Sequence, residues 1–126
     1  MTTCMLFLIL CQSRPGAVLN VAHAAAAFTD TWSTQRYLDN CIQPGRRCWE
    51  RNLVTRPFQS HGKPLAYVTT GLGVVGVSAI AHRMRRSDNR VIRRIWWLPQ
   101  AALIGAHAWG IHNNLSLDER HKRHHR

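Results

Sequence analysis

Two long stretches without a formal charge dominate the hydropathy pattern of this chain. The first covers residues 64–82, and a helix of these 19 residues is roughly 28 Å long, close to the bilayer hydrocarbon core of about 30 Å. The second covers 95–113, within an interval that has no formal charge between Arg94 and Asp118. Both blocks predict membrane-spanning helices. The alternative is two buried helices of a soluble domain, which is disfavoured because neither block has a charged face.

Tryptophans flank the second block. Trp96 and Trp97 open it and Trp109 lies near its far end, which is typical of a helix held at both membrane interfaces. Pro99 falls in the first turns of this helix, where its missing N–H costs little.

A third candidate span precedes these two. Between residues 17 and 35 the only formal charge is Asp30, and the segment is rich in alanine, the best helix former. It predicts a helix over 17–38. Alanine contributes little to membrane insertion, so the alternative is a helix packed against the other two at the membrane interface.

Shorter segments lie at both ends. Residues 1–16 form an apolar, signal-like run that we interpret as an uncleaved extension, because no basic residue precedes it. Whether a segment up to residue 24 is cleaved stays open. Residues 116–126 are basic and rich in histidine and predict a disordered tail. The membrane domain is therefore expected over 17–115.

Charge changes this picture by adding a polybasic connection. The chain has 17 Lys+Arg against 6 Asp+Glu, a formal net charge of +11, which argues against an ordinary cytosolic enzyme. It is 45% hydrophobic and its apolar residues come in blocks, which argues against disorder. The connection between the last two candidate spans contains six arginines, which are expected to contact anionic lipid headgroups: Arg83, Arg85, Arg86, Arg90, Arg93 and Arg94. Since they adjoin apolar spans, nucleic acid is not expected as a partner. Cations elsewhere leave the membrane orientation open, although we favour a cytoplasmic arginine connection.

Small residues recur at helical spacing in the two apolar blocks. Such stripes allow a neighbouring helix to approach closely. The predicted packing faces are Thr69, Gly73 and Gly76 in the first block and Ala101, Gly105 and Ala108 in the second. The run from Gly71 to Gly76 also matches G-x-G-x-x-G, but the chain lacks the acidic residue that a dinucleotide site needs about 20 positions later.

A polar stripe follows one face of the first helix. His23, Asp30 and Thr34 share this face with Ala27. A carboxylate at membrane depth is expensive, so Asp30 is expected to turn inward and find a partner. The candidate partners on the last helix are His107, His112 and Asn113.

Histidines and cysteines supply the remaining candidate chemistry. Two histidines that face each other across helices could ligate haem iron, but interhelical hydrogen bonding is the commoner role, so we expect no cofactor and no metal. Cys41 and Cys48 flank a Pro-Gly turn and could form a disulfide or remain free thiols. No catalytic residue set is evident.

The first helix and the segment after it resemble a family of small bacterial membrane proteins whose function is uncharacterised. The resemblance lies in Asp30-x-x-x-Thr34-x-x-x-Leu38 followed by Glu50-x-Asn52. The family continues with proline where this chain has Leu53, and the loop over 39–49 is longer and more basic here. The resemblance implies three helices and a bacterial source and supplies no activity.

Together these patterns predict an all-α integral membrane bundle of three helices in a bacterial inner membrane. The expected function is non-enzymatic, that of a structural or accessory membrane subunit. One alternative is a transport element that handles protons or a ligand through Asp30 and intramembrane histidines. Another is a redox subunit with bis-histidine haem. Partners are expected to be the lipid bilayer, a second copy of the chain, or other membrane proteins.

Overall fold

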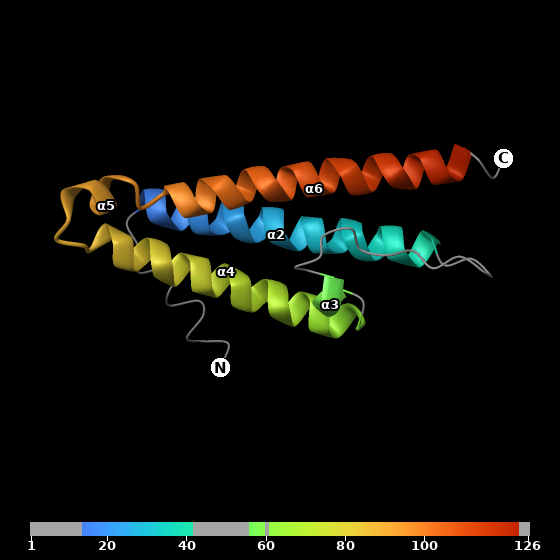
Figure 1. Cartoon of the computed structure of the whole chain (residues 1–126), viewed down its shortest axis with the longest axis horizontal. Coiled ribbons are helices and arrows are strands. Elements are labelled where there is room, and N and C mark those ends of the chain that lie inside the picture. Colours follow the sequence, from blue (N-terminus) through green and yellow to red (C-terminus); the bar gives the residue numbers. More distant parts are fainter. Residues whose placement is uncertain (1–13, 42–55, 60, 124–126) are drawn as a thin grey trace.

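The computed structural model describes residues 14–41, 56–59 and 61–123 and is all-helical over them. Its helices are α2 (Arg14–Cys41), α3 (Arg56–Gln59), α4 (Lys63–Arg85), α5 (Arg90–Arg94) and α6 (Leu98–Arg123), and these described parts contain no strand. The all-α class predicted from the sequence is therefore confirmed (Figure 1).

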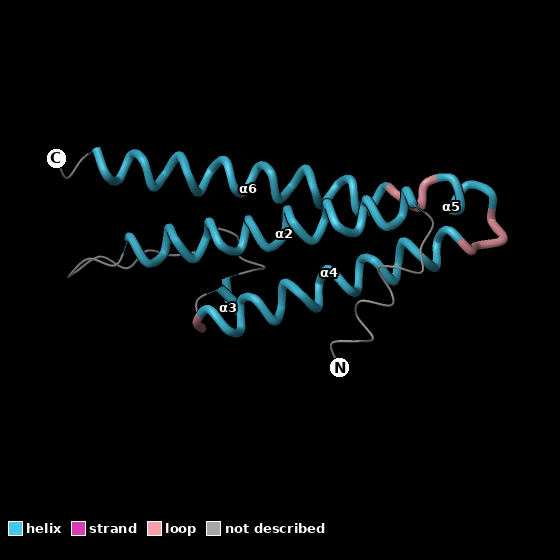
Figure 2. Tube along the Cα trace, turned by 180° about the vertical axis from the view of Figure 1, so that it is seen from behind, coloured by secondary structure: helices cyan, strands magenta, loops and turns pink. Residues whose placement is uncertain are grey.

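Helix α2 lies between α6 and α4, as the views from both sides show (Figures 1 and 2). It runs parallel to α6 and antiparallel to α4, and it contacts each of them far more extensively than they contact each other. The last two helices were expected to pack closely as an antiparallel hairpin. Helices α4 and α6 are antiparallel, but the prediction that they pack closely is wrong, because α2 lies between them.

The start of α4 follows from local backbone chemistry. Gly62 precedes it with a φ of 108°, a conformation that L side chains rarely adopt, and Pro64 lies in the first turn, where its missing N–H needs no partner. The predicted helices over 17–38 and 64–82 are both present and are extended at each end.

The third long helix begins later than predicted. Residues 90–94 form the separate helix α5, capped by the Asn89 side chain, which accepts a hydrogen bond from Val91 N at 2.9 Å. A turn with Trp96 and Trp97 follows, and α6 begins at Leu98. A helix continuous from residue 95 would set the Pro99 ring against a preceding carbonyl, whereas a start at Leu98 leaves it in the first turn.

Helix α6 continues well past its predicted end. It runs to Arg123, so the expectation of a disordered tail is wrong for residues 116–123. Asp118 explains part of the extension, because it is 4% exposed and binds side chains of α2.

The small-residue stripes do not form the contacts predicted for them within the chain. A Cβ added at Gly73, Gly76 or Gly105 would meet nothing within 4 Å. Thr69 donates to carbonyls of its own helix, Ala101 is half-buried and Ala108 is exposed. The close contacts of α4 instead involve Ala66 and Ala81, which are 0% and 2% exposed. Small residues permit a neighbouring helix to approach on any face of α4. Polar contacts with α2, such as that between Thr31 and Thr70, select the face that turns inward.

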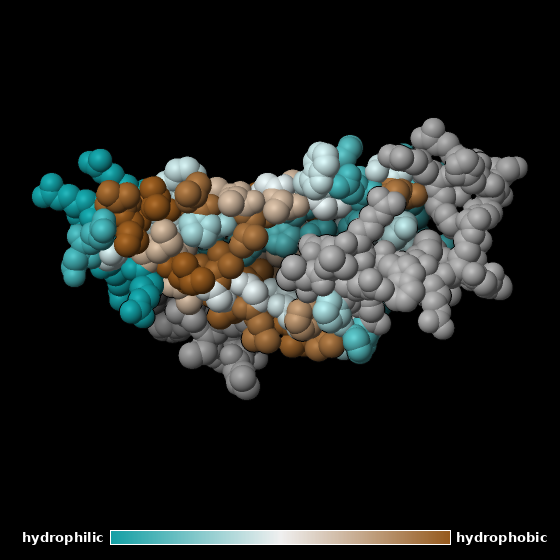
Figure 3. All heavy atoms as spheres, viewed as in Figure 1, coloured by the Kyte–Doolittle hydropathy of each residue, from teal (hydrophilic) through white to brown (hydrophobic). Residues whose placement is uncertain are grey.

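The bundle is polar inside and apolar outside. The buried hydrophobic residues of the described segments are all alanines, whereas nine buried residues are polar or charged. Large apolar side chains point outward, among them Val18, Val21, Val68, Leu72, Ile80 and Trp109, each more than half exposed. On the face shown in Figure 3, hydrophobic residues extend over much of the described surface. A bundle surrounded by water would have the opposite distribution.

Of the three predicted spans, one meets the length and hydropathy of a membrane-crossing helix within the described residues. This is α4, whose apolar window has a mean hydropathy of 1.6 and is 11% buried in the structure.

Ala66→Leu should destabilise the protein by about 1–3 kcal/mol, because Ala66 is 0% exposed and the larger side chain has no open space to enter. Gly76→Leu, on the open face of the same helix, is the matched control and should leave the thermal unfolding midpoint unchanged or raised. Equal losses of stability in both variants would contradict the assigned faces.

Candidate functional site

A line of hydrogen-bonding side chains, most of them buried or half-buried, joins α2 to α6 along most of their length. We call this line the polar seam. Its residues are Asn20, His23, Asp30, Ser33, Thr34, Arg36 and Asn40 on α2, and Gln100, His107, Asn114 and Asp118 on α6. Steps of three or four residues bring side chains back to one helix face, so each parallel helix can present such a line to the other.

Amide and hydroxyl groups make the contacts on both sides of the seam's centre. Gln100 Nε2 donates to Asn20 Oδ1 near the start of both helices, and both residues are buried. Further along, Asn114 Nδ2 donates to Ser33 Oγ at 3.0 Å and to Thr34 Oγ1 at 2.8 Å. The donor groups of these amides thus meet acceptors across the interface, whereas the buried Oε1 of Gln100 has no hydrogen-bond partner among the described residues.

The centre of the seam is ionisable. Nδ1 of His107 lies 2.9 Å from Oδ2 of Asp30, and each side chain is about one quarter exposed. The His23 ring packs beside His107 with ring centroids 5.8 Å apart. His23 is 2% exposed, and its Nδ1 has no hydrogen-bond partner among the described residues. One carboxylate and two imidazoles thus meet inside the bundle.

Gly110 makes this centre possible. A Cβ on Gly110 would lie 2.6 Å from Oδ1 of Asp30 and 3.0 Å from its Cγ, which is closer than real Cβ atoms approach. Only glycine at this position lets the backbone of α6 sit directly against the carboxylate.

The seam ends in a charged cluster near the carboxyl ends of α2 and α6. Oδ2 of Asp118 lies 3.4 Å from Nε of Arg36, and Asn40 Nδ2 donates to Oδ1 of Asp118 at 2.8 Å. The Arg36 guanidinium also lies over the Trp32 ring, 5.4 Å from its centroid. Both carboxylate oxygens of Asp118 are therefore engaged.

Helix α2 makes a second, smaller set of polar contacts with α4 and α3. The hydroxyls of Thr31 and Thr70 lie 2.6 Å apart, and Gln35 Nε2 donates to Oε1 of the buried Gln59 at 2.8 Å. An ion pair of 2.6 Å joins Lys63 Nζ to Asp39.

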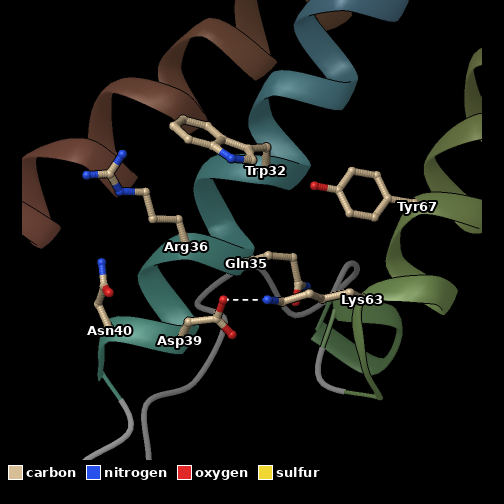
Figure 4. Close-up of a pocket in the computed structure, with 7 residues that line it drawn as sticks. All are labelled: Trp32, Gln35, Arg36, Asp39, Asn40, Lys63 and Tyr67. Carbon is tan, nitrogen blue, oxygen red and sulfur yellow. Dashed lines mark ion pairs between the residues drawn. The ribbon is translucent and has the colours of Figure 1, made fainter.

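A half-open cavity of about 230 Å³ lies between α2 and α4 at the Lys63 end of the bundle. Figure 4 shows the Lys63–Asp39 ion pair at its mouth and the Tyr67 hydroxyl directed toward α2. It is lined by Trp32, Gln35, Arg36, Asp39, Asn40, Lys63 and Tyr67. Its charged groups already pair with one another or with Asp118, and the side-chain amides of Gln35 and Asn40 donate to Gln59 and Asp118.

The structure brings together some of the predicted site residues and separates others. Of the three candidate partners for Asp30, His107 makes the contact. His112 is exposed and lies beside Trp109 on the outside of α6, whereas Asn113 is half-buried and its backbone carbonyl accepts a bond from Ser116. Thr34 binds Asn114 instead of sharing the partner of Asp30.

Parts of the predicted motifs lie outside the described residues. Leu38 is half-buried on α2, but Glu50, Asn52 and Cys48 lie in the segment 42–55. The family motif beyond α2 and the pairing of Cys41 with Cys48 therefore stay predictions.

Sequence reasoning missed most of the seam, since only His23, Asp30, Thr34 and His107 were predicted. Asn20, Gln100, Asn114 and Gly110 were not predicted, although three are amides within apolar helices and so carried the same signal as Asp30. The relative register of α2 and α6 was needed to pair them, and single helix patterns do not contain it.

The histidine pair does not fit a haem. Bis-histidine ligation would require a porphyrin between the His23 and His107 rings, but the contact of Gly110 with Asp30 holds α2 and α6 too close for the macrocycle. Among the described residues no group of three or more His, Cys, Asp and Glu side chains is placed to hold a metal ion.

No family model, curated protein or solved structure matches this chain. The resemblance to small bacterial membrane proteins therefore stays a prediction based on its motif residues.

Gly110→Ala should break the Asp30–His107 contact and destabilise the protein by about 1–3 kcal/mol, because the new methyl group overlaps the carboxylate. Gly105→Ala lies on the open face of the same helix and should be neutral or stabilising by up to about 1 kcal/mol. Thermal unfolding of the two variants in one detergent provides the measurement. A Gly110→Ala variant as stable as Gly105→Ala would show that the close approach is not needed.

Proposed function

We propose that this chain is a small integral membrane protein without enzymatic chemistry, and that the polar seam is its working element. The reversed polarity of the bundle supports this proposal most directly. Polar residues such as His23, Thr34 and Gln100 are buried, whereas Val68, Leu72 and Trp109 are exposed. In lipid the exposed apolar side chains meet an apolar solvent and the polar ones find partners within the protein.

The seam explains how α2 and α6 cross the membrane together with α4 although their own hydropathy is lower. They have 28 and 26 residues, so each is about 40 Å long and exceeds the hydrocarbon core. Part of their low mean hydropathy comes from seam residues, which face the other helix and not the lipid, and part from exposed charged residues near their carboxyl ends, such as Asp39 and Glu119. Paired in this way, α2 and α6 present an outer surface that a membrane accepts.

The full-length protein should remain in the membrane pellet after alkaline carbonate washing, because its apolar exterior is held by lipid and not by charge. Its release into the supernatant, in a monodisperse folded form, would contradict the membrane proposal.

Proton handling is the activity that the centre of the seam supports best. Asp30 and His107 can exchange a proton directly across their 2.9 Å contact, and His23 adds a second imidazole next to His107. Ionisable groups inside a membrane bundle typically mark proton or ion pathways. The amide and hydroxyl pairs on both sides of this centre extend a line of hydrogen-bonding groups toward each end of the bundle.

A purely structural role, as an accessory membrane subunit, is the second candidate. The contacts of Asn20 with Gln100 and of Asn114 with Ser33 and Thr34 favour it, because these groups do not titrate and bind one helix to the other. In this case Asp30 and His107 add one more interhelical bond of the same kind.

Substitutions of Asp30 separate the two roles. Asp30→Asn keeps a hydrogen-bonding group and should retain most of the thermal stability, whereas Asp30→Leu leaves His107 without a partner and should lose roughly 1–2 kcal/mol. In proteoliposomes with an internal pH dye and an imposed potential, wild-type protein should pass protons and Asp30→Asn should reduce the flux to that of protein-free vesicles. Equal fluxes from wild type and Asp30→Asn, with Asp30→Leu unstable, would leave the structural role.

A further inference from the structure

The end of the bundle formed by α4, α5 and the start of α6 carries a dense positive charge that no ion pair among the described residues neutralises. We call it the arginine end, and it consists of Arg83, Arg85, Arg86, Arg90, Arg93 and Arg94. No ion pair among the described residues involves any of these six side chains, all of which are exposed or half-buried. The one acidic residue within 83–94 is Asp88.

At the opposite end, the two cations whose side chains the structure describes are paired. Arg36 contacts Asp118, and Lys63 contacts Asp39 at 2.6 Å. The number of cations in the sequence does not distinguish the two ends of the bundle. The ion pairs distinguish them, because they are found at the end opposite the arginines. The excess positive field of the described residues is concentrated at the arginine end.

Apolar side chains are interleaved with these arginines. Val91 is 66% exposed on α5, and Ile92, Ile95, Trp97 and Leu98 are exposed beside it. The Arg85 guanidinium lies 5.4 Å from the centroid of the Trp96 ring. Figure 3 shows strongly hydrophobic and hydrophilic residues next to one another at this end of the molecule. Cations next to exposed apolar and indole groups are the pattern of a segment that lies at a membrane interface.

We propose that the arginine end binds the phosphate groups of anionic phospholipids, with the apolar residues of α5 and the following turn inserted at the level of the glycerol backbone. The location in a membrane rests on the proposed function, whereas the preference for anionic headgroups rests on the unpaired arginines. Guanidinium groups donate two parallel hydrogen bonds to phosphate oxygens, which suits them to this ligand. Helix α4 ends among these arginines, so they lie at the depth where headgroups begin.

Nucleic acid offers phosphates as well, but it fits this surface less well. Its backbone is fully hydrated and provides no apolar layer for Val91, Ile92 and Ile95. A phospholipid supplies both the phosphate and an adjacent apolar phase.

Lipid retention by the full-length, detergent-solubilised protein tests the proposal. The protein is equilibrated with equal amounts of phosphatidylglycerol and phosphatidylcholine, and bound lipids are counted by native mass spectrometry. We expect roughly tenfold more bound phosphatidylglycerol than phosphatidylcholine, because each cation near an anionic headgroup strengthens binding several-fold. The preference should fall as salt concentration rises.

Two variants with equal losses of charge provide the control. In the first, Arg86, Arg90, Arg93 and Arg94 are replaced by glutamine, and in the second the same change is made at Arg120, Lys122, Arg123 and Arg126 in the carboxyl-terminal segment. The first should lose the preference for phosphatidylglycerol and the second should keep it.

Three outcomes would overturn the proposal. The first is equal retention of both lipids by the wild type, and the second is an equal loss of preference in both variants. The third is that a short RNA displaces bound phosphatidylglycerol at a lower concentration than added phosphatidylglycerol does. Failure of the membrane proposal looks different, because a protein released by carbonate can still retain phosphatidylglycerol in this assay.

Discussion

Pairing of buried polar side chains between α2 and α6 is the interaction on which the rest of this structure depends. A bundle whose buried hydrophobic residues are alanines has little apolar surface to hold its helices together from within. Hydrogen bonds across the seam supply the directional contacts, and each is selective because an amide or carboxylate must meet a partner of suitable geometry. The register of α6 against α2 is thereby fixed over some 20 residues.

The position of α4 follows from the same constraint. Because α2 uses one face for the seam, it offers α4 a different face that carries Thr31, Gln35 and Phe28. Phe28 stacks on Tyr67 with ring centroids 6.3 Å apart, and Thr31 contacts Thr70. The open faces of α4, including Gly73 and Gly76, are those left over once these contacts form.

Much of the helical framework could be predicted from the sequence, and less of the site. Charge-free blocks and alanine content located three long helices, and most of the predicted helix ends lie within a few residues of the observed ones. These signals are local, which is why a sequence reveals them. The isolated carboxylate of Asp30 likewise indicated an inward position. The break before Leu98 depended on how Pro99 limits the start of a helix, and the continuation to Arg123 depended on Asp118 finding partners on α2. Both the partner of Thr34 and the close approach of Gly110 depend on the spacing of two helices that are distant in sequence, and composition does not encode that spacing.

The parallel arrangement of α2 and α6 also sets an order of events during synthesis. Partners in the seam are 77–84 residues apart in sequence, so the polar face of α2 emerges from the ribosome on the order of 10 s before its counterpart on α6. During that interval Asp30 and His23 lack the partners on α6 that they contact in the folded protein. Under the proposed membrane location, α2 would then stay outside the apolar phase until the last helix is made. The α2–α6 contacts can therefore form only after the carboxyl-terminal helix has been synthesised.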